Sequence, residues 1–114
     1  MDQIQDIKEN CEFKLSQGDV NIYRLKTRPN LETKPFKGSI LVTGDGGHTH
    51  AAVGAKAIGQ TPEGQWVLEI GKKGAGFEHN GKHQPAFELE EGFYLVDRAR
   101  EKGMLNDMVA PVAD

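Results

Sequence analysis

Hydrophobic and polar positions alternate over several short stretches of this chain, and turns rich in glycine or proline separate them. Val20 and Ile22 alternate with polar residues and predict a strand over residues 19–25, because successive side chains of a strand point to opposite faces. Apolar runs or alternating residues, bounded by turn signals, predict further strands over 39–43, 65–70, 75–79, 85–89 and 93–100. About six to seven short strands with frequent turns predict an all-β fold, a small antiparallel barrel or sandwich.

The two ends of the chain carry different patterns. Ile4, Ile7 and Cys11 have the spacing of one helical face, so residues 2–12 are predicted to form a short amphipathic helix that docks on this domain, docks on a partner or frays. Apolar residues with little charge among them predict an extended C-terminal tail that packs on a neighbour; they are Met104, Leu105, Met108 and Val109. The expected organisation is an N-terminal arm or short helix (1–17), a β-domain (18–102) and the tail (103–114).

Residues 48–60 fit two structures. As a strand, they would place His48 and His50 on one face near a rim, opposite an apolar core face formed by Thr49, Ala51, Val53, Ala55 and Ala57. As a helix after the glycine-rich turn Gly44–Gly47, they would hold a phosphate on backbone N–H groups, with Glu69 at the distance of a ribose contact. The helix would contain Gly54 and Gly59, each destabilising it by about 1 kcal/mol relative to alanine. Its glycine spacing is also not the dinucleotide fingerprint.

Composition narrows the function classes. The net charge is −3 and the fourteen basic residues are spread along the chain, which argues against a nucleic-acid surface, since such a surface needs clustered basic residues. The single cysteine, Cys11, excludes an internal disulfide and indicates a reducing compartment. No signal peptide and no apolar run of the roughly 20 residues needed to cross a bilayer is visible. We therefore expect a location in the cytoplasm, or in a virus particle assembled there, and no membrane partner.

The four histidines form two pairs, His48-x-His50 and His79-x-x-x-His83. Residues at i and i+2 of a strand point to the same side, and antiparallel folding can bring the second pair to the first. Neutral imidazole is a common ligand of divalent transition metals. The sequence therefore predicts a metal site formed by His48, His50, His79 and His83, with zinc as the first choice and iron, manganese or nickel as others.

A carboxylate often completes such a ligand shell, and the candidates are Glu69, Glu78 and Glu88. Glu78 is the weakest of them because it is adjacent to His79 and points the other way in a strand. A closed shell of four histidines would be structural, whereas three with an open position would permit catalysis. Neither a Ser-His-Asp order nor a pair of carboxylates stands out in the sequence, so a non-enzymatic role is favoured. The alternative to any site is that these histidines are ordinary residues of exposed turns.

The chain resembles a small family of β-domain proteins encoded in bacterial and phage genomes, for which no activity is established. The resemblance covers about residues 18–114 and is carried by Gly47, His48, His50, His79, His83, Pro85, Leu89, Gly92, Tyr94, Val96, Arg98, Arg100, Glu101, Val112, Ala113 and Asp114. The chain departs from the family in a wider second histidine pair and in Ala99 and Lys102, where Gln and Tyr are usual. The resemblance implies a fold and a histidine site.

A fainter resemblance is to cupins, metal-binding β-barrels in which a glycine precedes His-x-His. Cupins have a glutamate shortly after that pair, and this chain has no acid between His50 and Glu63. The leading hypothesis is thus a non-enzymatic β-domain, metal-binding through its histidines, that forms a homo-oligomer or a structural part of a phage- or mobile-element-encoded assembly. The alternatives are a cupin-like metalloenzyme acting on a small molecule and nucleotide binding through Gly44–Gly47.

Overall fold

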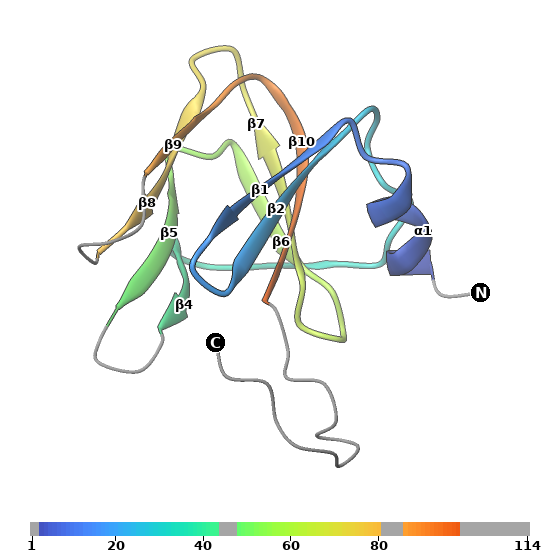
Figure 1. Cartoon of the computed structure of the whole chain (residues 1–114), viewed down its shortest axis with the longest axis horizontal. Coiled ribbons are helices and arrows are strands. Elements are labelled where there is room, and N and C mark those ends of the chain that lie inside the picture. Colours follow the sequence, from blue (N-terminus) through green and yellow to red (C-terminus); the bar gives the residue numbers. More distant parts are fainter. Residues whose placement is uncertain (1–2, 44–47, 81–85, 99–114) are drawn as a thin grey trace.

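The computed structural model describes residues 3–43, 48–80 and 86–98 (Figure 1). These residues form one helix and ten strands. The elements are α1 (Gln3–Glu9), β1 (Phe13–Gln17), β2 (Val20–Leu25), β3 (Lys34–Pro35), β4 (Ile40–Thr43), β5 (Thr49–Val53), β6 (Ala57–Gln60), β7 (Trp66–Ile70), β8 (Ala75–His79), β9 (Phe87–Leu89) and β10 (Gly92–Arg98). The prediction of a predominantly β protein with a short N-terminal helix is confirmed.

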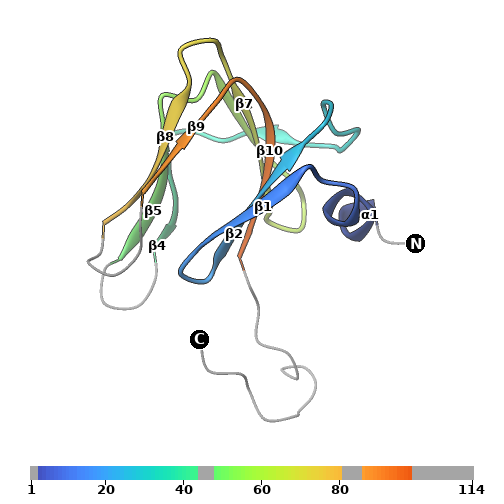
Figure 2. The same cartoon turned by 45° about the horizontal axis from the view of Figure 1, so that its top comes forward.

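The strands belong to two antiparallel sheets that are not closed into one hydrogen-bonded barrel. Sheet A has six strands in the order β1-β2-β10-β7-β6-β3, and sheet B has four in the order β4-β5-β8-β9. Figures 1 and 2 show sheet B as a separate layer beside sheet A. The chain changes sheet four times, between β3 and β4, β5 and β6, β7 and β8, and β9 and β10.

Each change of sheet takes place at a glycine with positive φ. These glycines are Gly38 (87°), Gly54 (90°), Gly74 (76°) and Gly92 (149°), and side chains of the L configuration rarely adopt such conformations. Space is also limited at Gly74, where a Cβ atom would lie 3.0 Å from the backbone oxygen of Leu89. Backbone geometry therefore requires glycine where the chain passes from one sheet to the other.

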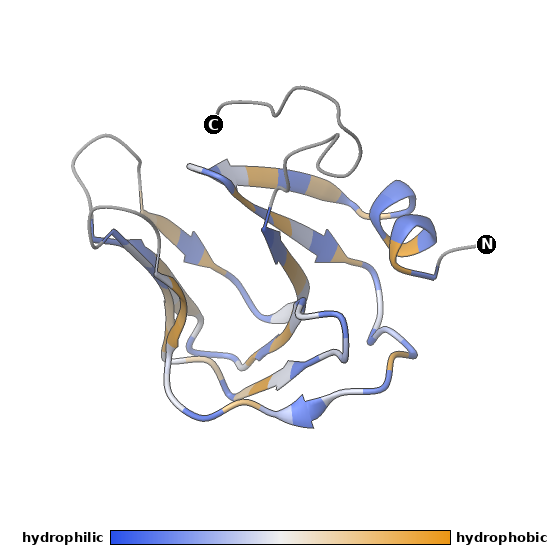
Figure 3. Cartoon of the chain, turned by 90° about the horizontal axis from the view of Figure 1, so that it is seen from below, coloured by the Kyte–Doolittle hydropathy of each residue, from blue (hydrophilic) through white to orange (hydrophobic). Residues whose placement is uncertain are grey.

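The main core lies between the two sheets. In β7 the residues Trp66, Leu68 and Ile70 are buried while those between them are half-buried, and the alternating colours of Figure 3 follow this pattern along the strands. Sheet B contributes Phe77 and Leu89 to the same cluster. Burying a large apolar side chain stabilises a fold by about 1.5–3 kcal/mol, so this shared core is what holds the two sheets together.

A second apolar cluster lies on the other face of sheet A, where α1 packs. Ile4 of the helix is buried there against Tyr23, Leu25 and Leu95. The ammonium group of Lys8, near the end of the helix, forms an ion pair with Asp97 of β10. Of the three outcomes expected for the N-terminal segment, docking on its own domain is the one observed.

The number of strands predicted, six to seven, is too low. Residues 13–17 were assigned to the N-terminal arm but form β1, the edge strand of sheet A. Between the predicted strands 19–25 and 39–43, the structure has a further two-residue strand, β3. Residues 48–60 are not one strand, because the turn at Gly54 ends β5 and the chain enters sheet A as β6.

The predicted faces of β5 are also reversed. His50 and Ala52 are buried, whereas Val53 is 42% exposed. The prediction assigned the small apolar residues to the core, but such residues occur on both faces here and carry little information about which face is inside. Burial of a polar ring is tolerated where its nitrogens find partners, and Gln17 is the partner of Nδ1 here.

The last two predictions concern the C-terminal tail and membrane-spanning segments. The predicted tail, 103–114, lies outside the described residues. The helix found in the described part has seven residues, and no described helix is long and apolar enough to cross a membrane.

Candidate functional site

Three of the four histidines lie together at one end of sheet B. His50 of β5 pairs directly with His79 of β8 in the antiparallel register. Their ring centroids are 4.6 Å apart with an interplanar angle of 36°. His48 precedes β5, and its ring centroid lies 5.4 Å from that of His79. The predicted convergence of His48, His50 and His79 is thus present, while His83 lies outside the described residues.

His50 is the buried member of this group, and a glutamine determines its tautomer. Its exposed fraction is 3%, and its Nδ1 atom lies 2.7 Å from Oε1 of Gln17, the last residue of β1. The Gln17 amide nitrogen donates to the backbone oxygen of Phe77 at 3.2 Å, so Oε1 is the accepting end of the amide. Nδ1 of His50 therefore carries the hydrogen, and Nε2 carries a lone pair in the neutral ring.

Asp19 faces that second nitrogen. It lies between β1 and β2, and its Oδ1 atom is 3.7 Å from Nε2 of His50. The other carboxylate oxygen, Oδ2, accepts a hydrogen bond from Nε of Arg98 at 2.9 Å. Gln17 is the last residue of a strand of sheet A, Asp19 lies in the turn that follows it, and His50 belongs to sheet B. The site is therefore a polar contact between the two sheets.

Burial and neighbouring charges lower the pKa of His50. The largest cause is loss of solvation, which disfavours the charged ring, and repulsion from His79 acts in the same direction. Attraction to Asp19 opposes these effects without reversing them, and Arg98 and His48 add smaller lowering contributions. The neutral imidazole, the form that binds metals, is thus favoured at this position.

The side chains as they lie do not yet form a coordination shell. Among the described residues, no three side chains of His, Cys, Asp or Glu are arranged to hold one ion. The Nδ1 atom of His79 is nevertheless buried without a hydrogen-bond partner. A buried polar atom in this state destabilises a fold by about 1–3 kcal/mol unless something binds it.

The carboxylates predicted as additional ligands lie elsewhere. Glu69 is bound to Arg28 (3.1 Å) and Lys56 (3.3 Å), and it pairs in register with Phe93 on the helix-covered face of sheet A. Glu78 and Glu88 are exposed, and Glu78 alternates with His79 along β8 and so points away from it.

The groups around His50 were not predicted: Gln17 and Asp19 face its two ring nitrogens, and Arg98 holds Asp19. The available signal was the alternation of 13–17, which ends in a tight turn at Gly18 and Asp19. This pattern could have indicated a hairpin with Gln17 on an inward-facing position.

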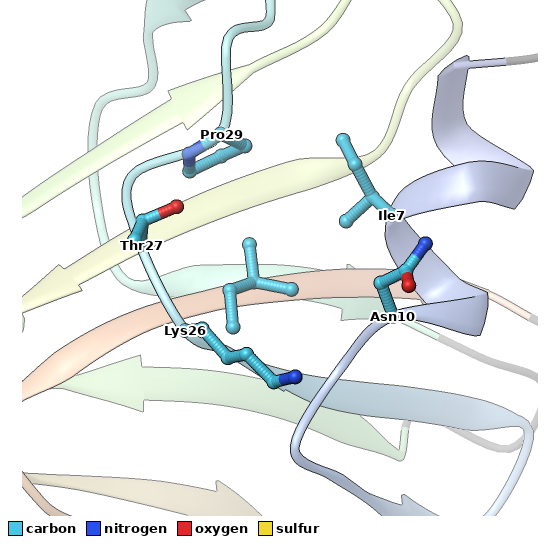
Figure 4. Close-up of a pocket in the computed structure, with 6 residues that line it drawn as sticks. Ile7, Asn10, Lys26, Thr27 and Pro29 are labelled. Atoms are coloured by element: carbon cyan, nitrogen blue, oxygen red, sulfur yellow. The ribbon is translucent and has the colours of Figure 1, made fainter.

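Three surface hollows lie away from the histidines. The first, of about 200 Å³, separates α1 from the segment after β2 and is lined by Ile7, Asn10, Leu25, Lys26, Thr27 and Pro29 (Figure 4). Two others, of about 420 and 270 Å³, lie beside β3 and β6. None of the three is lined by a histidine, so none of them provides a substrate cavity beside the predicted metal site.

The nucleotide-binding alternative required a helix over about residues 48–58. The described structure has β5 at Thr49–Val53 instead, so the strand–turn–helix arrangement of a phosphate-binding loop is lacking there. The glycine turn itself, Gly44–Gly47, lies outside the described residues.

Comparisons with known proteins identify no family for this chain. The chain matches no protein-family model, no curated protein and no solved structure.

Proposed function

We propose that this chain is a non-enzymatic β-domain that binds a divalent transition metal, zinc first, through its clustered histidines. The observation that carries the proposal is the direct pairing of His50 with His79 across β5 and β8, with the His48 ring beside them. His48 is exposed and His79 is half-buried, so rotation about their side-chain bonds can turn their nitrogens towards a common ion. His83 is the fourth proposed ligand.

A structural role of the metal is favoured over catalysis. Protein groups face both ring nitrogens of His50, Gln17 at Nδ1 and Asp19 at Nε2. Four histidine ligands would close the shell around the ion, whereas an enzyme site requires an open coordination position. The bound ion would stabilise the domain rather than activate a water molecule.

Metal titration of the full chain tests this proposal. After chelator treatment, addition of Co²⁺ is expected to produce the visible absorption of a protein-bound ion, and Zn²⁺ is expected to displace it. His48→Ala, His79→Ala and His83→Ala should each weaken binding. Thr49→Ala is the matched control, because Thr49 lies between His48 and His50 and points to the opposite face. Absence of binding by the unmodified chain, or unchanged binding by His79→Ala, would contradict the proposal.

We also propose that the domain is part of a homo-oligomer or a larger assembly, such as a phage- or mobile-element-encoded virus particle. The apolar residues of 103–114 support this in the sequence, and exposed Phe13, Ile40 and Val53 support it on the strands. The apolar face of the N-terminal helix is not part of this surface, because it packs on its own sheet. Size-exclusion chromatography with light scattering is the test, and a monomer at every concentration would count against an oligomer.

A further inference from the structure

The contact between Asp19 and His50 brings together two groups that both accept hydrogen bonds. Gln17 receives the hydrogen of Nδ1, which leaves a lone pair on Nε2 of the neutral ring. Oδ1 of the ionised carboxylate, 3.7 Å away, also carries only lone pairs. Two such atoms repel each other unless a proton or a cation lies between them.

Their separation suits a metal ion. Bonds from zinc to imidazole nitrogen and to carboxylate oxygen are each about 2.0–2.2 Å long. Two ligands of a tetrahedral ion therefore lie roughly 3.4 Å apart. The observed separation of 3.7 Å between Nε2 and Oδ1 differs from this by a few tenths of an ångström, which side-chain rotation can supply.

A neighbouring atom favours a metal over a proton. Nδ1 of His79 is buried and has no hydrogen-bond partner, and its ring lies 4.6 Å from that of His50. A proton between His50 and Asp19 would join those two groups alone. A metal ion has several coordination positions and can engage a nitrogen of His79 as well.

The surroundings of the two groups match those of known ligands. The Nδ1–H group of a histidine that binds metal through Nε2 usually donates to an oxygen acceptor, which orients the ring, and Oε1 of Gln17 is such an acceptor. The second oxygen of Asp19 is held by Arg98, which orients the carboxylate. The Asp19 side chain is 18% exposed.

We propose that Asp19 is a carboxylate ligand of the metal, which binds Nε2 of His50 and a nitrogen of His79, and that a single ion thereby bridges sheet A and sheet B. This inference rests on the proposed function and goes beyond it. The histidines belong to sheet B, and Asp19 adds a ligand from the turn between β1 and β2 of sheet A. A metal bound in this way links the hairpin β1–β2 to the opposite sheet.

The test compares Asp19→Asn with Asp97→Asn in the full, chelator-treated chain. Asp97 is a matched control, because its side chain is 17% exposed and is also held in an ion pair, by Lys8 on the other face of sheet A. Removing a ligand should weaken Co²⁺ and Zn²⁺ binding by at least about 10–100-fold, the loss known for changes to the outer shell alone. Asp97→Asn should leave the affinity unchanged.

The outcomes separate the two proposals. If the unmodified chain binds metal and Asp19→Asn binds it equally well, Asp19 is not a ligand, although the histidine site stands. If the unmodified chain binds no metal, the proposed function fails and the inference fails with it.

A measurement on the unmodified chain keeps the inference falsifiable if Asp19→Asn does not fold. Addition of Zn²⁺ should shift the carboxylate ¹³C resonance of Asp19 and the Nε2 resonance of His50, and leave the carboxylate of Asp97 in place. If the chain binds Zn²⁺ and the carboxylate resonance of Asp19 does not shift, Asp19 is not a ligand and the inference is overturned. Two protonated nitrogens on His50 at neutral pH before metal is added would show that a proton occupies the gap, which also overturns it.

Discussion

Sheet A contacts the rest of the molecule in two regions that are built from different chemistry. Its outer face receives α1 through apolar side chains, with Ile4 against Tyr23, Leu25 and Leu95. At the end of its inner face, Gln17 and Asp19 contact His50 of sheet B through hydrogen-bonding groups. Apolar contact is non-directional and tolerates small displacements. Hydrogen bonding specifies distances and angles, so the inner region is the one suited to hold a ligand.

Two aspartates make the same contrast at the level of single groups. Asp97 and Asp19 are equally buried, and each is in an ion pair, with Lys8 and with Arg98 respectively. The ion pair of Asp97 places a cation against an anion. Asp19 has a further oxygen directed at a nitrogen that has no hydrogen to donate in its neutral form. The contact between Asp19 and Nε2 of His50 thus lacks a shared hydrogen, and this supports the metal ion proposed to bind between them.

The largest effect is expected from the apolar region. Leu95 is fully buried beneath α1, so Leu95→Ala should lower the free energy of unfolding by about 2–5 kcal/mol through lost burial and the cavity left behind. Urea denaturation measures this. Val53→Ala is the control, since Val53 is 42% exposed and its loss should change stability by no more than about 0.5 kcal/mol. Equal effects of the two substitutions would show that the outer cluster contributes little.

A smaller effect is expected from the polar region in the absence of metal. Gln17→Leu leaves the Nδ1–H group of His50 and the backbone oxygen of Phe77 without their partner, which should lower the free energy of unfolding by about 1–3 kcal/mol. Ser16→Ala, which removes an exposed hydrogen bond to Asn21, is the matched control on the same strand. If Gln17→Leu leaves the free energy of unfolding unchanged or raises it, the polar contact does not depend on its hydrogen bonds and the contrast with the apolar region fails.

The pH dependence of stability should also come from the polar region. The pKa of His50 is lowered in the folded chain, mainly by burial, so the unfolded chain binds a proton more readily than the folded one. The contribution of His50 to stability is therefore complete above its ordinary pKa of about 6.5 and decreases as the pH falls towards the lower folded value.

Urea titrations between neutral and mildly acidic pH, on chelator-treated protein, test this dependence. His50→Gln should have a shallower loss of stability on acidification than the unmodified chain. His48→Gln should retain most of the loss, because His50 is still present. A stability that rises on acidification, and does so only when His50 is present, would reverse the assigned direction.

The smallest effect is expected from the ion pair on the outer face. Lys8 and Asp97 are partly exposed, so Lys8→Gln should reduce the free energy of unfolding by at most about 1 kcal/mol, and less at high salt. Thermal unfolding at low and high ionic strength measures this. A loss as large as that of Leu95→Ala would mean that α1 is held by charge rather than by apolar contact.

The same contrast explains what could be predicted from the sequence. Strands β2, β7 and β10 were anticipated because branched and aromatic residues are concentrated in them and occupy their buried positions. Strand β1 was missed because the residue that it buries is Gln17, and polarity concealed the pattern. His50 was assigned to the wrong face of β5 because small apolar residues occur on both faces of that strand.

The candidate site was predictable only within one sheet. His50 and His79 lie on neighbouring antiparallel strands and His48 directly precedes the first of them, so their approach follows from strand pairing. Gln17 and Asp19 come from the other sheet, and Gln17 is 33 positions from His50 in the sequence. Packing of one sheet on another leaves no period in the sequence, so no pattern in the chain associates Asp19 with the histidines.

The glycines at the four changes of sheet have a consequence for how this protein could be redesigned. The side chains of the core can be exchanged for others of similar volume with modest effects on stability. Gly38, Gly54, Gly74 and Gly92 have backbone angles that most substitutions would strain. Homologous or engineered sequences that adopt this architecture should therefore vary widely inside and keep glycine at these four positions.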